Sequence, residues 1–117
     1  MQENSLIYER GDIVIIELPF SDATGSKLRP TLVVSNSQYN SNRKDVLLAK
    51  ISGSYYETEW EIKLQKEDVI GEELKKDSYI DIGFITTSEK SLIKKKVGKL
   101  KKEKLEEVIR KLEKLFM

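Results

Sequence analysis

One arginine stands where the sequence could hold it rigidly enough for chemistry. Arg29 precedes Pro30, between a polar loop at residues 19–28 and an apolar run at residues 31–34. Proline fixes its own φ at about −65° and favours extended backbone at the residue before it. A guanidinium on such backbone offers planar, permanently charged donors, a geometry that suits a phosphate. The competing interpretation is a surface arginine that pairs with a loop carboxylate such as Asp22.

A serine is the second candidate. Ser52 ends the strand predicted at residues 45–52 and is followed by Gly53. A serine hydroxyl can donate to a phosphoryl oxygen or orient an attacking hydroxyl group. It can also satisfy the backbone of the turn that Gly53 indicates. The residues alone leave both roles open.

The composition removes several classes of chemistry. The 117 residues include no cysteine and no histidine. A disulfide, a thiol nucleophile, a zinc–thiolate site and a histidine base are therefore excluded. Any acid–base step must use carboxylates, lysine, tyrosine, arginine or water, and we expect neither a metal nor a cofactor.

Charge and hydropathy narrow the class of protein. Hydrophobic residues make up 38% of the sequence and charged residues 35%, which is typical of a globular chain, and we expect one domain over residues 1–117. No apolar run is long enough to cross a membrane and the first residues do not resemble a signal peptide, so we expect a cytoplasmic protein without a membrane partner. Residues 90–117 contain eleven Lys or Arg and four Glu, a net charge of +7 that leaves −6 for residues 1–89. This asymmetry predicts a surface for nucleic acid or for an acidic protein.

Short runs rich in β-branched residues, bounded by turn formers, predict a mainly β chain. Alternation predicts that Trp60 is buried and that Phe84 shares one face with Ile80 and Ile82. We expect loops at residues 19–28 and 37–44, and an irregular segment or one helical turn at residues 66–74. The predicted strands are residues 11–18, 31–36, 45–52, 59–64, 78–86 and 94–100.

The end of the chain is the clearest helix. Its apolar residues recur at helical spacing and form one amphipathic stripe: Leu105, Val108, Ile109, Leu112, Leu115 and Phe116. Several short strands followed by one terminal helix predict an α+β fold that is mainly β, a small twisted barrel with a C-terminal helix.

The order of several short motifs resembles the MazF/PemK family of toxins from toxin–antitoxin systems. Residues 10–36 carry Gly-Asp-Ile, an apolar strand, a polar loop with a glycine, and Arg-Pro-Thr-Leu-Val-Val-Ser-Asn. Lys-Ile-Ser-Gly at 50–53, Lys-Asp-Ser-Tyr-Ile at 76–80 and Val-Gly-Lys-Leu at 97–100 follow in the family's order. The matches extend from Arg10 to Phe116, and their order is more specific than any single motif.

The resemblance implies a fold and an activity. Members of the family adopt an SH3-like barrel of the MazF/Kid/CcdB type and act as sequence-selective, metal-independent endoribonucleases on single-stranded RNA. Attack of a 2′-OH on the adjacent phosphate leaves a 2′,3′-cyclic phosphate and a 5′-OH. The resemblance also implies a homodimer with RNA in a groove across the subunit interface, and a cognate antitoxin that blocks this groove.

The resemblance also implies roles for individual residues. Arg29 matches the family's catalytic cation, which stabilises charge on the phosphoryl oxygens. Ser52 matches the hydroxyl residue that the family has beside this arginine. RNA contacts are expected from the loop and from the turn after Ser52: Thr24, Gly25, Ser26 and Lys27, then Gly53, Ser54 and Tyr55.

The chain departs from the family at its acidic residues. Thr24 stands where many members carry a glutamate, and Gly83 and Thr86 stand where many carry an acidic and a second basic residue. Asp22 and Asp81 are candidate substitutes as acid or base. Each could equally be a solvated surface charge.

Two other functions fit the same fold. One is a non-enzymatic topoisomerase poison of the CcdB type, which would need neither the Arg-Pro pair nor Ser52. The other is a catalytically weak RNA-binding relative, which predicts salt-sensitive RNA binding without a cyclic-phosphate product. An RNA cleavage assay beside a gyrase supercoiling assay distinguishes the three functions.

Overall fold

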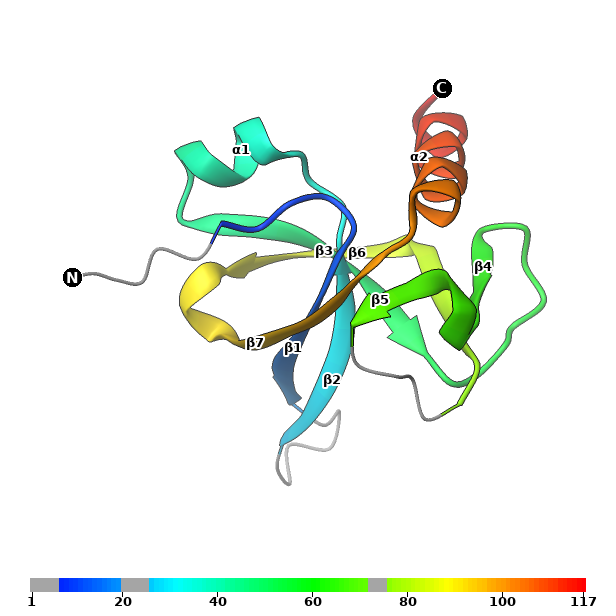
Figure 1. The fold of residues 1–117 in the computed structure, drawn as a ribbon, viewed down its shortest axis with the longest axis horizontal. Helices are drawn as coiled ribbons and strands as arrows, with labels where there is room; N and C mark the ends of the chain where they lie inside the picture. The colour runs from blue at the N-terminus through cyan, green and yellow to red at the C-terminus, as the bar shows by residue number, and fades with distance from the viewer. Residues whose placement is uncertain (1–6, 20–25, 72–75) are drawn as a thin grey trace.

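A single antiparallel sheet dominates the computed structural model, which describes residues 7–19, 26–71 and 76–117 (Figure 1). Across the sheet the strands follow the order β4-β6-β3-β2-β1-β7-β5. In chain order they are β1 (Asp12–Pro19), β2 (Ser26–Val33), β3 (Asp45–Ser52), β4 (Glu61–Leu64), β5 (Val69–Gly71), β6 (Ser78–Glu89) and β7 (Ile93–Leu100). The helices are α1 (Ser37–Asn42) and α2 (Lys102–Phe116), with one-turn 3-10 helices η1 (Lys66–Asp68) and η2 (Lys90–Leu92).

Two apolar cores lie on opposite faces of the central strands. Because side chains alternate along a strand, β2 and β3 contribute to both cores. In the larger core, Leu32 and Ala49 pack in one cluster with Val108 of α2. In the smaller core, Val33 and Leu48 pack in a cluster with residues of β1 and the segment before it. The predicted fold class, a mainly β barrel-like sheet with a C-terminal helix, is confirmed.

Helix α2 forms where the amphipathic stripe predicts it. Val108 is fully buried, and Leu105, Leu112 and Leu115 pack against the larger core. Phe116, at the end of the stripe, is exposed instead. In Figure 1 the helix stands over one end of the sheet, beside β6.

Helix α1 corrects the loop predicted at residues 37–44. Asn36 caps this helix, because its side chain accepts the Tyr39 N–H at 2.8 Å. Asn40 is buried, and its amide donates to Tyr8 O at 2.8 Å and to Ser35 O at 3.0 Å. Polar hydrogen bonds hold α1 in place of an apolar stripe, so hydrophobic periodicity did not indicate it.

Several predicted boundaries are also wrong. β2 begins at Ser26, which pairs with Pro19, so Ser26 and Lys27 belong to a strand and the predicted loop is shorter. β2 ends at Val33, three residues before its predicted end. Residues 69–71 form β5, which pairs with β7. Backbone pairing at the edge of a sheet needs no hydrophobic pattern, so the sequence did not indicate this strand. β6 continues through residue 89, past its predicted end.

Two aromatic side chains do not have the burial or the face that strand alternation predicts for them. Trp60 is only half-buried, and the Lys111 ammonium lies 5.8 Å from its ring centroid. Phe84 does not share the face of the buried Ile82, and 48% of it is exposed.

The cause of the Phe84 error is a bulge in β6. Ala49 of β3 pairs with Ile85, whereas the next residue of β3 pairs with Asp81. The residues of β6 between these two partners have no counterpart on β3, and such an insertion redirects the side chains within it. Phe84 therefore turns toward the face that carries Lys50.

Candidate active site

Arg29 and Ser52, the two residues singled out by the sequence, line one pocket of about 640 Å³. Its walls come from β1, β2, β3 and β6, from the turn that follows β3, and from the segment just before β6. The lining residues are Ile16, Lys27, Arg29, Pro30, Thr31, Lys50, Ile51, Ser52, Gly53, Ser54, Tyr56, Lys76, Phe84 and Thr86.

The register of β2 and β3 directs Arg29 and Ser52 into the same space. The ladder between these strands reaches as far as Thr31, which pairs with Lys50. Continued by two residues, the same register sets Arg29 opposite Ser52. Since side chains two residues apart share a face, all four side chains lie on the side of the smaller core.

Pro30 explains why the ladder ends there. Val34 donates its N–H to Leu47 O at 2.9 Å, toward β3. Alternate residues of an antiparallel strand direct their N–H groups to the same neighbour, so position 30 also faces β3. Proline has no N–H to donate. The pairing of β2 with β3 stops at this residue, and the pocket lies beyond it.

The hydroxyl of Ser52 takes part in the turn after β3. Its Oγ accepts the N–H of Ser54 at 3.0 Å. A hydroxyl that accepts one hydrogen bond keeps its own proton to donate. The structural role and a contact with a phosphoryl oxygen are therefore compatible.

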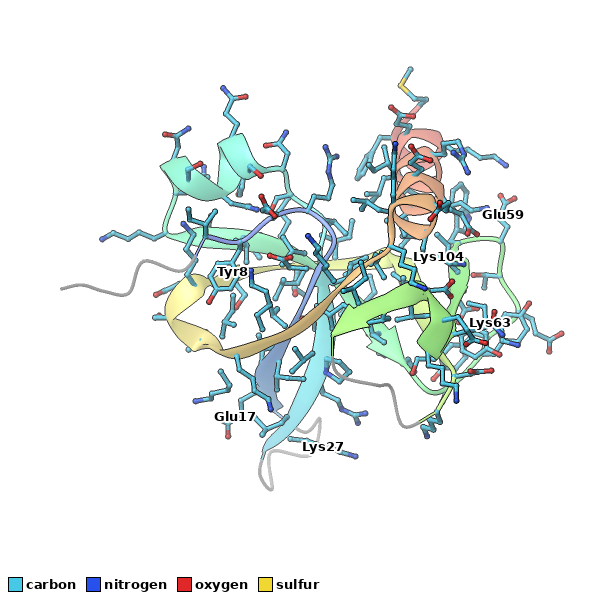
Figure 2. The ribbon with its side chains drawn as sticks, viewed as in Figure 1. Tyr8, Glu17, Lys27, Glu59, Lys63 and Lys104 are labelled. Carbon is cyan, nitrogen blue, oxygen red and sulfur yellow. The ribbon has the colours of Figure 1, made fainter. Side chains whose placement is uncertain are left out.

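The pocket is strongly basic. Four cations line it, and the described lining residues include no carboxylate. Lys27 and Arg29 are exposed on β2, with Lys27 near the tip of the strand in Figure 2. Lys50 and Lys76 complete the set. Such a cluster favours an anion, and a phosphate matches both its charge and its hydrogen-bond donors.

Two of the four cations were missed by the sequence reasoning. The Lys50 ammonium lies 4.9 Å from the centroid of the Phe84 ring. Lys76 lies against Gly53, where an added Cβ would come within 2.9 Å of its Nζ. The spacing of Lys50, two residues before Ser52 on the same strand, could have indicated a shared face. Lys76 left no signal, because its approach to Gly53 depends on the tertiary fold.

The turn after β3 presents its two tyrosines differently. Tyr55 stacks on Tyr79, with ring centroids 4.8 Å apart and planes at 17°, and it does not line the pocket. Tyr56 does line it. The Glu61 carboxylate holds this turn by accepting the N–H groups of Tyr56 at 3.0 Å and of Thr58 at 3.1 Å.

The structure describes only some of the remaining predicted site residues. Asp22, Thr24 and Gly25 fall outside the described residues. Asp81 does not line the pocket, and its carboxylate accepts the N–H of Gly83 at 3.0 Å.

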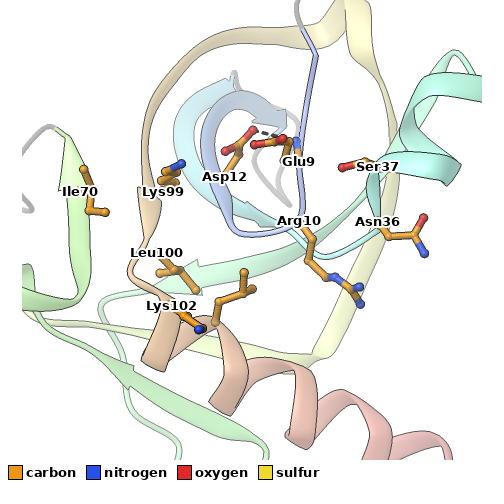
Figure 3. A pocket seen from close by; sticks show the side chains of 10 residues that line it. Glu9, Arg10, Asp12, Asn36, Ser37, Ile70, Lys99, Leu100 and Lys102 are labelled. Carbon is orange, nitrogen blue, oxygen red and sulfur yellow. Dashed lines mark hydrogen bonds between the residues drawn. The ribbon is translucent and has the colours of Figure 1, made fainter.

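A second cavity of about 500 Å³ lies where the segment before β1 meets β7 and α2 (Figure 3). It mixes acidic and basic groups: Glu9, Asp12, Arg10, Lys99 and Lys102. The buried Asp12 carboxylate accepts the Glu9 N–H at 2.8 Å and pairs with Lys96 at 3.2 Å. Because its carboxylates offset its cations, this cavity suits a phosphate less well than the basic pocket does.

The part of the chain that the structure describes was also compared with the requirements for a metal site and for a membrane-spanning helix. Its Asp and Glu side chains form no group of three that could hold a metal ion. None of its helices is long and apolar enough to cross a membrane.

Comparison with solved structures finds the same fold. An endoribonuclease from mycobacterial species superposes with a TM-score of 0.76 at 17% identity, over 97% of this chain and 95% of that chain. The MazE–MazF structure (form III) from Deinococcus radiodurans gives 0.75 at 18% identity, over 95% and 97%. A mycobacterial endoribonuclease in complex with its cognate antitoxin gives 0.73 at 16% identity, over 93% and 94%. At these identities the likeness concerns the fold.

Comparison of the sequence with curated proteins finds no match. Residues 9–116, however, match the family described as PemK-like, MazF-like toxin of type II toxin–antitoxin system. This range runs from the segment before β1 to the last turn of α2 and includes both Arg29 and Ser52. Since nearly the whole sequence carries the family pattern and folds as its known structures do, the chain belongs to the PemK-like, MazF-like toxins of type II toxin–antitoxin systems.

Proposed function

We propose that this protein is an endoribonuclease that cuts single-stranded RNA in the pocket between β2 and β3. The observation that carries the proposal is the meeting of Arg29 and Ser52 in one basic pocket whose described lining holds no carboxylate. A phosphodiester is the anion that a guanidinium and a hydroxyl suit together. Two solved proteins with this fold are endoribonucleases.

The proposed reaction is an internal transesterification of RNA. The 2′ oxygen of a ribose attacks the adjacent phosphorus while the bond from phosphorus to the 5′ oxygen breaks. The 2′-OH proton passes to water and the leaving 5′ oxygen gains a proton, which gives a 2′,3′-cyclic phosphate and a 5′-OH. Arg29 stabilises the charge that grows on the phosphoryl oxygens, and Ser52 donates to one of them or orients the 2′-OH.

Contacts with the flanking nucleotides would select the cleavage sequence. Cations and backbone N–H groups bind phosphates, and aromatic rings stack on unpaired bases. The residues proposed for these contacts belong to two segments of the sequence: Thr24, Gly25, Ser26 and Lys27, and then Gly53, Ser54 and Tyr55.

The reaction is proposed to need no metal. Mg²⁺ in phosphoryl-transfer sites is held by carboxylates together with waters and substrate oxygens. The described lining of the pocket offers cations and hydroxyls in place of such ligands. The charge that a metal would stabilise then falls to Arg29 and its neighbouring lysines.

The proposed functional unit is a cytoplasmic homodimer, with RNA in a groove across the subunit interface and a cognate antitoxin that blocks this groove. Among proteins with this fold, one is in complex with its cognate antitoxin and another is a MazE–MazF complex. An acidic antitoxin segment would be attracted by the same cations that attract RNA. RNA and antitoxin are therefore expected to compete.

The test is cleavage of a long single-stranded RNA by the purified protein in EDTA. We expect cuts with 2′,3′-cyclic phosphate and 5′-OH ends. Arg29→Ala should slow cleavage by at least about 100-fold, the effect of losing one preorganised charge donor. The matched control is Arg43→Ala, because this exposed arginine pairs with Asp45 at 2.8 Å and does not line the pocket.

Three outcomes would contradict the proposal. Full activity of Arg29→Ala would remove the residue from the mechanism. Inhibition of gyrase without RNA cleavage would instead identify a CcdB-type poison. Salt-sensitive RNA binding without a cyclic-phosphate product would identify a relative that only binds RNA.

A further inference from the structure

We infer that Lys50 is a second phosphate-binding cation of the pocket and that Phe84 holds it in position. The inference rests on the proposed function and adds two residues to the site. It is carried by the contact between the Lys50 ammonium and the Phe84 ring, 4.9 Å from the ring centroid, inside the pocket that Arg29 and Ser52 line.

The position of Lys50 follows from the sheet. It pairs with Thr31 across the β2–β3 ladder and precedes Ser52 by two residues on β3. A strand rises by about 3.3 Å per residue, so the Cα atoms of Lys50 and Ser52 are separated by about 7 Å. A four-carbon stem carries the ammonium across such a distance. Lys50 can therefore reach a phosphate that Arg29 and Ser52 bind.

The bulge in β6 supplies the partner for this lysine. Without it, alternation would direct Phe84 to the same face as Ile82, which is buried in the larger core. The bulge turns the ring to the pocket, where it lies under the ammonium. Bulges commonly redirect one side chain next to a functional site.

The contact with Phe84 leaves the charge of Lys50 available. Cation–π attraction fixes the position of an ammonium without neutralising it, whereas a carboxylate would cancel its charge. Lys50 is half-buried and, among the described residues, forms no ion pair. Asp81 is the register partner of Lys50 on β6, but no ion pair joins them, and the Asp81 carboxylate accepts the Gly83 N–H instead. A half-buried cation that keeps its charge is suited to bind a phosphate oxygen.

Binding and cleavage of single-stranded RNA test the inference. Binding is measured in an Arg29→Ala background, which keeps the RNA intact, by fluorescence anisotropy over a range of KCl concentrations. Lys50→Met should lower the slope of log Kd against log salt by about 0.7, the value for one phosphate contact on a single strand. Lys50→Arg should keep the slope, because arginine retains the charge and also stacks on aromatic rings.

Cleavage then separates positioning from charge. With Arg29 intact, Lys50→Met should cut more slowly by about tenfold under single-turnover conditions, the effect of one charge-assisted contact. Phe84→Leu should slow cleavage severalfold while largely keeping the salt slope, because the ammonium remains but loses its platform. Lys44→Met is the matched control, since Lys44 is exposed and does not line the pocket.

The outcomes distinguish this inference from the proposed function. An unchanged salt slope and unchanged cleavage in Lys50→Met would overturn the inference, and the proposed function would stand if Arg29→Ala is inactive. Equal losses in Lys50→Met and Lys44→Met would also overturn it. A wild-type chain that neither binds nor cuts RNA would overturn both. Thermal unfolding checks each variant, and Lys50→Gln replaces Lys50→Met if the latter does not fold.

Discussion

Gly53→Ala should move one lysine and little else. An alanine Cβ would stand 2.9 Å from Nζ and 3.0 Å from Cε of Lys76, whereas nonbonded atoms settle at about 3.5–4.0 Å. The lysine must therefore retreat by roughly 0.5–1 Å or swing away. Gly53 is not among the residues with positive φ, so its backbone accepts alanine. Because Lys76 is exposed, we expect the free energy of unfolding to change by less than about 0.5 kcal/mol.

The functional effect should be larger than the structural one. In the proposed complex with RNA, displacing the ammonium would remove one charge-assisted contact, worth about 1.5 kcal/mol. Single-turnover cleavage should then slow by about tenfold. Gly83→Ala is the matched control: this exposed glycine of β6 has Asp81 Oδ1 at 3.4 Å from an added Cβ, which is ordinary contact.

A double-mutant cycle decides whether the effect passes through the lysine. Lys76→Met alone should slow cleavage as much as Gly53→Ala does. In the Lys76→Met background, Gly53→Ala should have no further effect, because the displaced group is absent. If Gly53→Ala keeps its full effect there, the glycine backbone acts on RNA directly and the argument from Lys76 is wrong.

Two further predictions concern the scaffold. Asn40→Ala should lower the free energy of unfolding by about 2–4 kcal/mol in urea titrations, because it leaves buried partners in Tyr8 and Ser35 without hydrogen bonds. Burial, and then Asp12, raise the pKa of Tyr8. The neutral Tyr8 phenol therefore contributes its full stabilisation below the unfolded-state pKa of about 10, and this contribution is lost as pH rises through the higher pKa of the folded state. Tyr8→Phe should therefore show a smaller fall in the free energy of unfolding as pH rises above about 10.

Most strands and the last helix were predictable because their buried apolar residues recur at the spacing typical of a strand or a helix. The β3 run, residues 45–52, is apolar enough that its bounds are the same in the structure. The stripe of α2 repeats with the period of a helix. Helix α1 was not predictable in this way, since Asn36 and Asn40 hold it through polar bonds. A cap residue three positions before the amide it binds was the one local signal.

The candidate site was predictable only where it follows the strands. Ser52 ends a predicted strand, and Arg29 comes two residues before another, so the register of these two strands brings both side chains to one pocket. Phe84 lines the pocket because of the bulge in β6, and Lys76 lines it beside Gly53. Neither leaves a periodic signal, because both depend on residues that meet across different segments.

The net charge of each region of the sequence does not indicate where the basic pocket lies. Residues 90–117 are basic and residues 1–89 are acidic, yet all four cations of the pocket belong to the acidic part. Charges in physiological salt act over about 8 Å, so a phosphate responds to the groups that line the pocket. Several carboxylates of the acidic part are occupied elsewhere, as Asp12 is with Lys96 and Glu61 with the turn after β3. Cations and carboxylates that are neighbours in the sequence are thus separated in the fold, and the strand register determines which of them line the pocket.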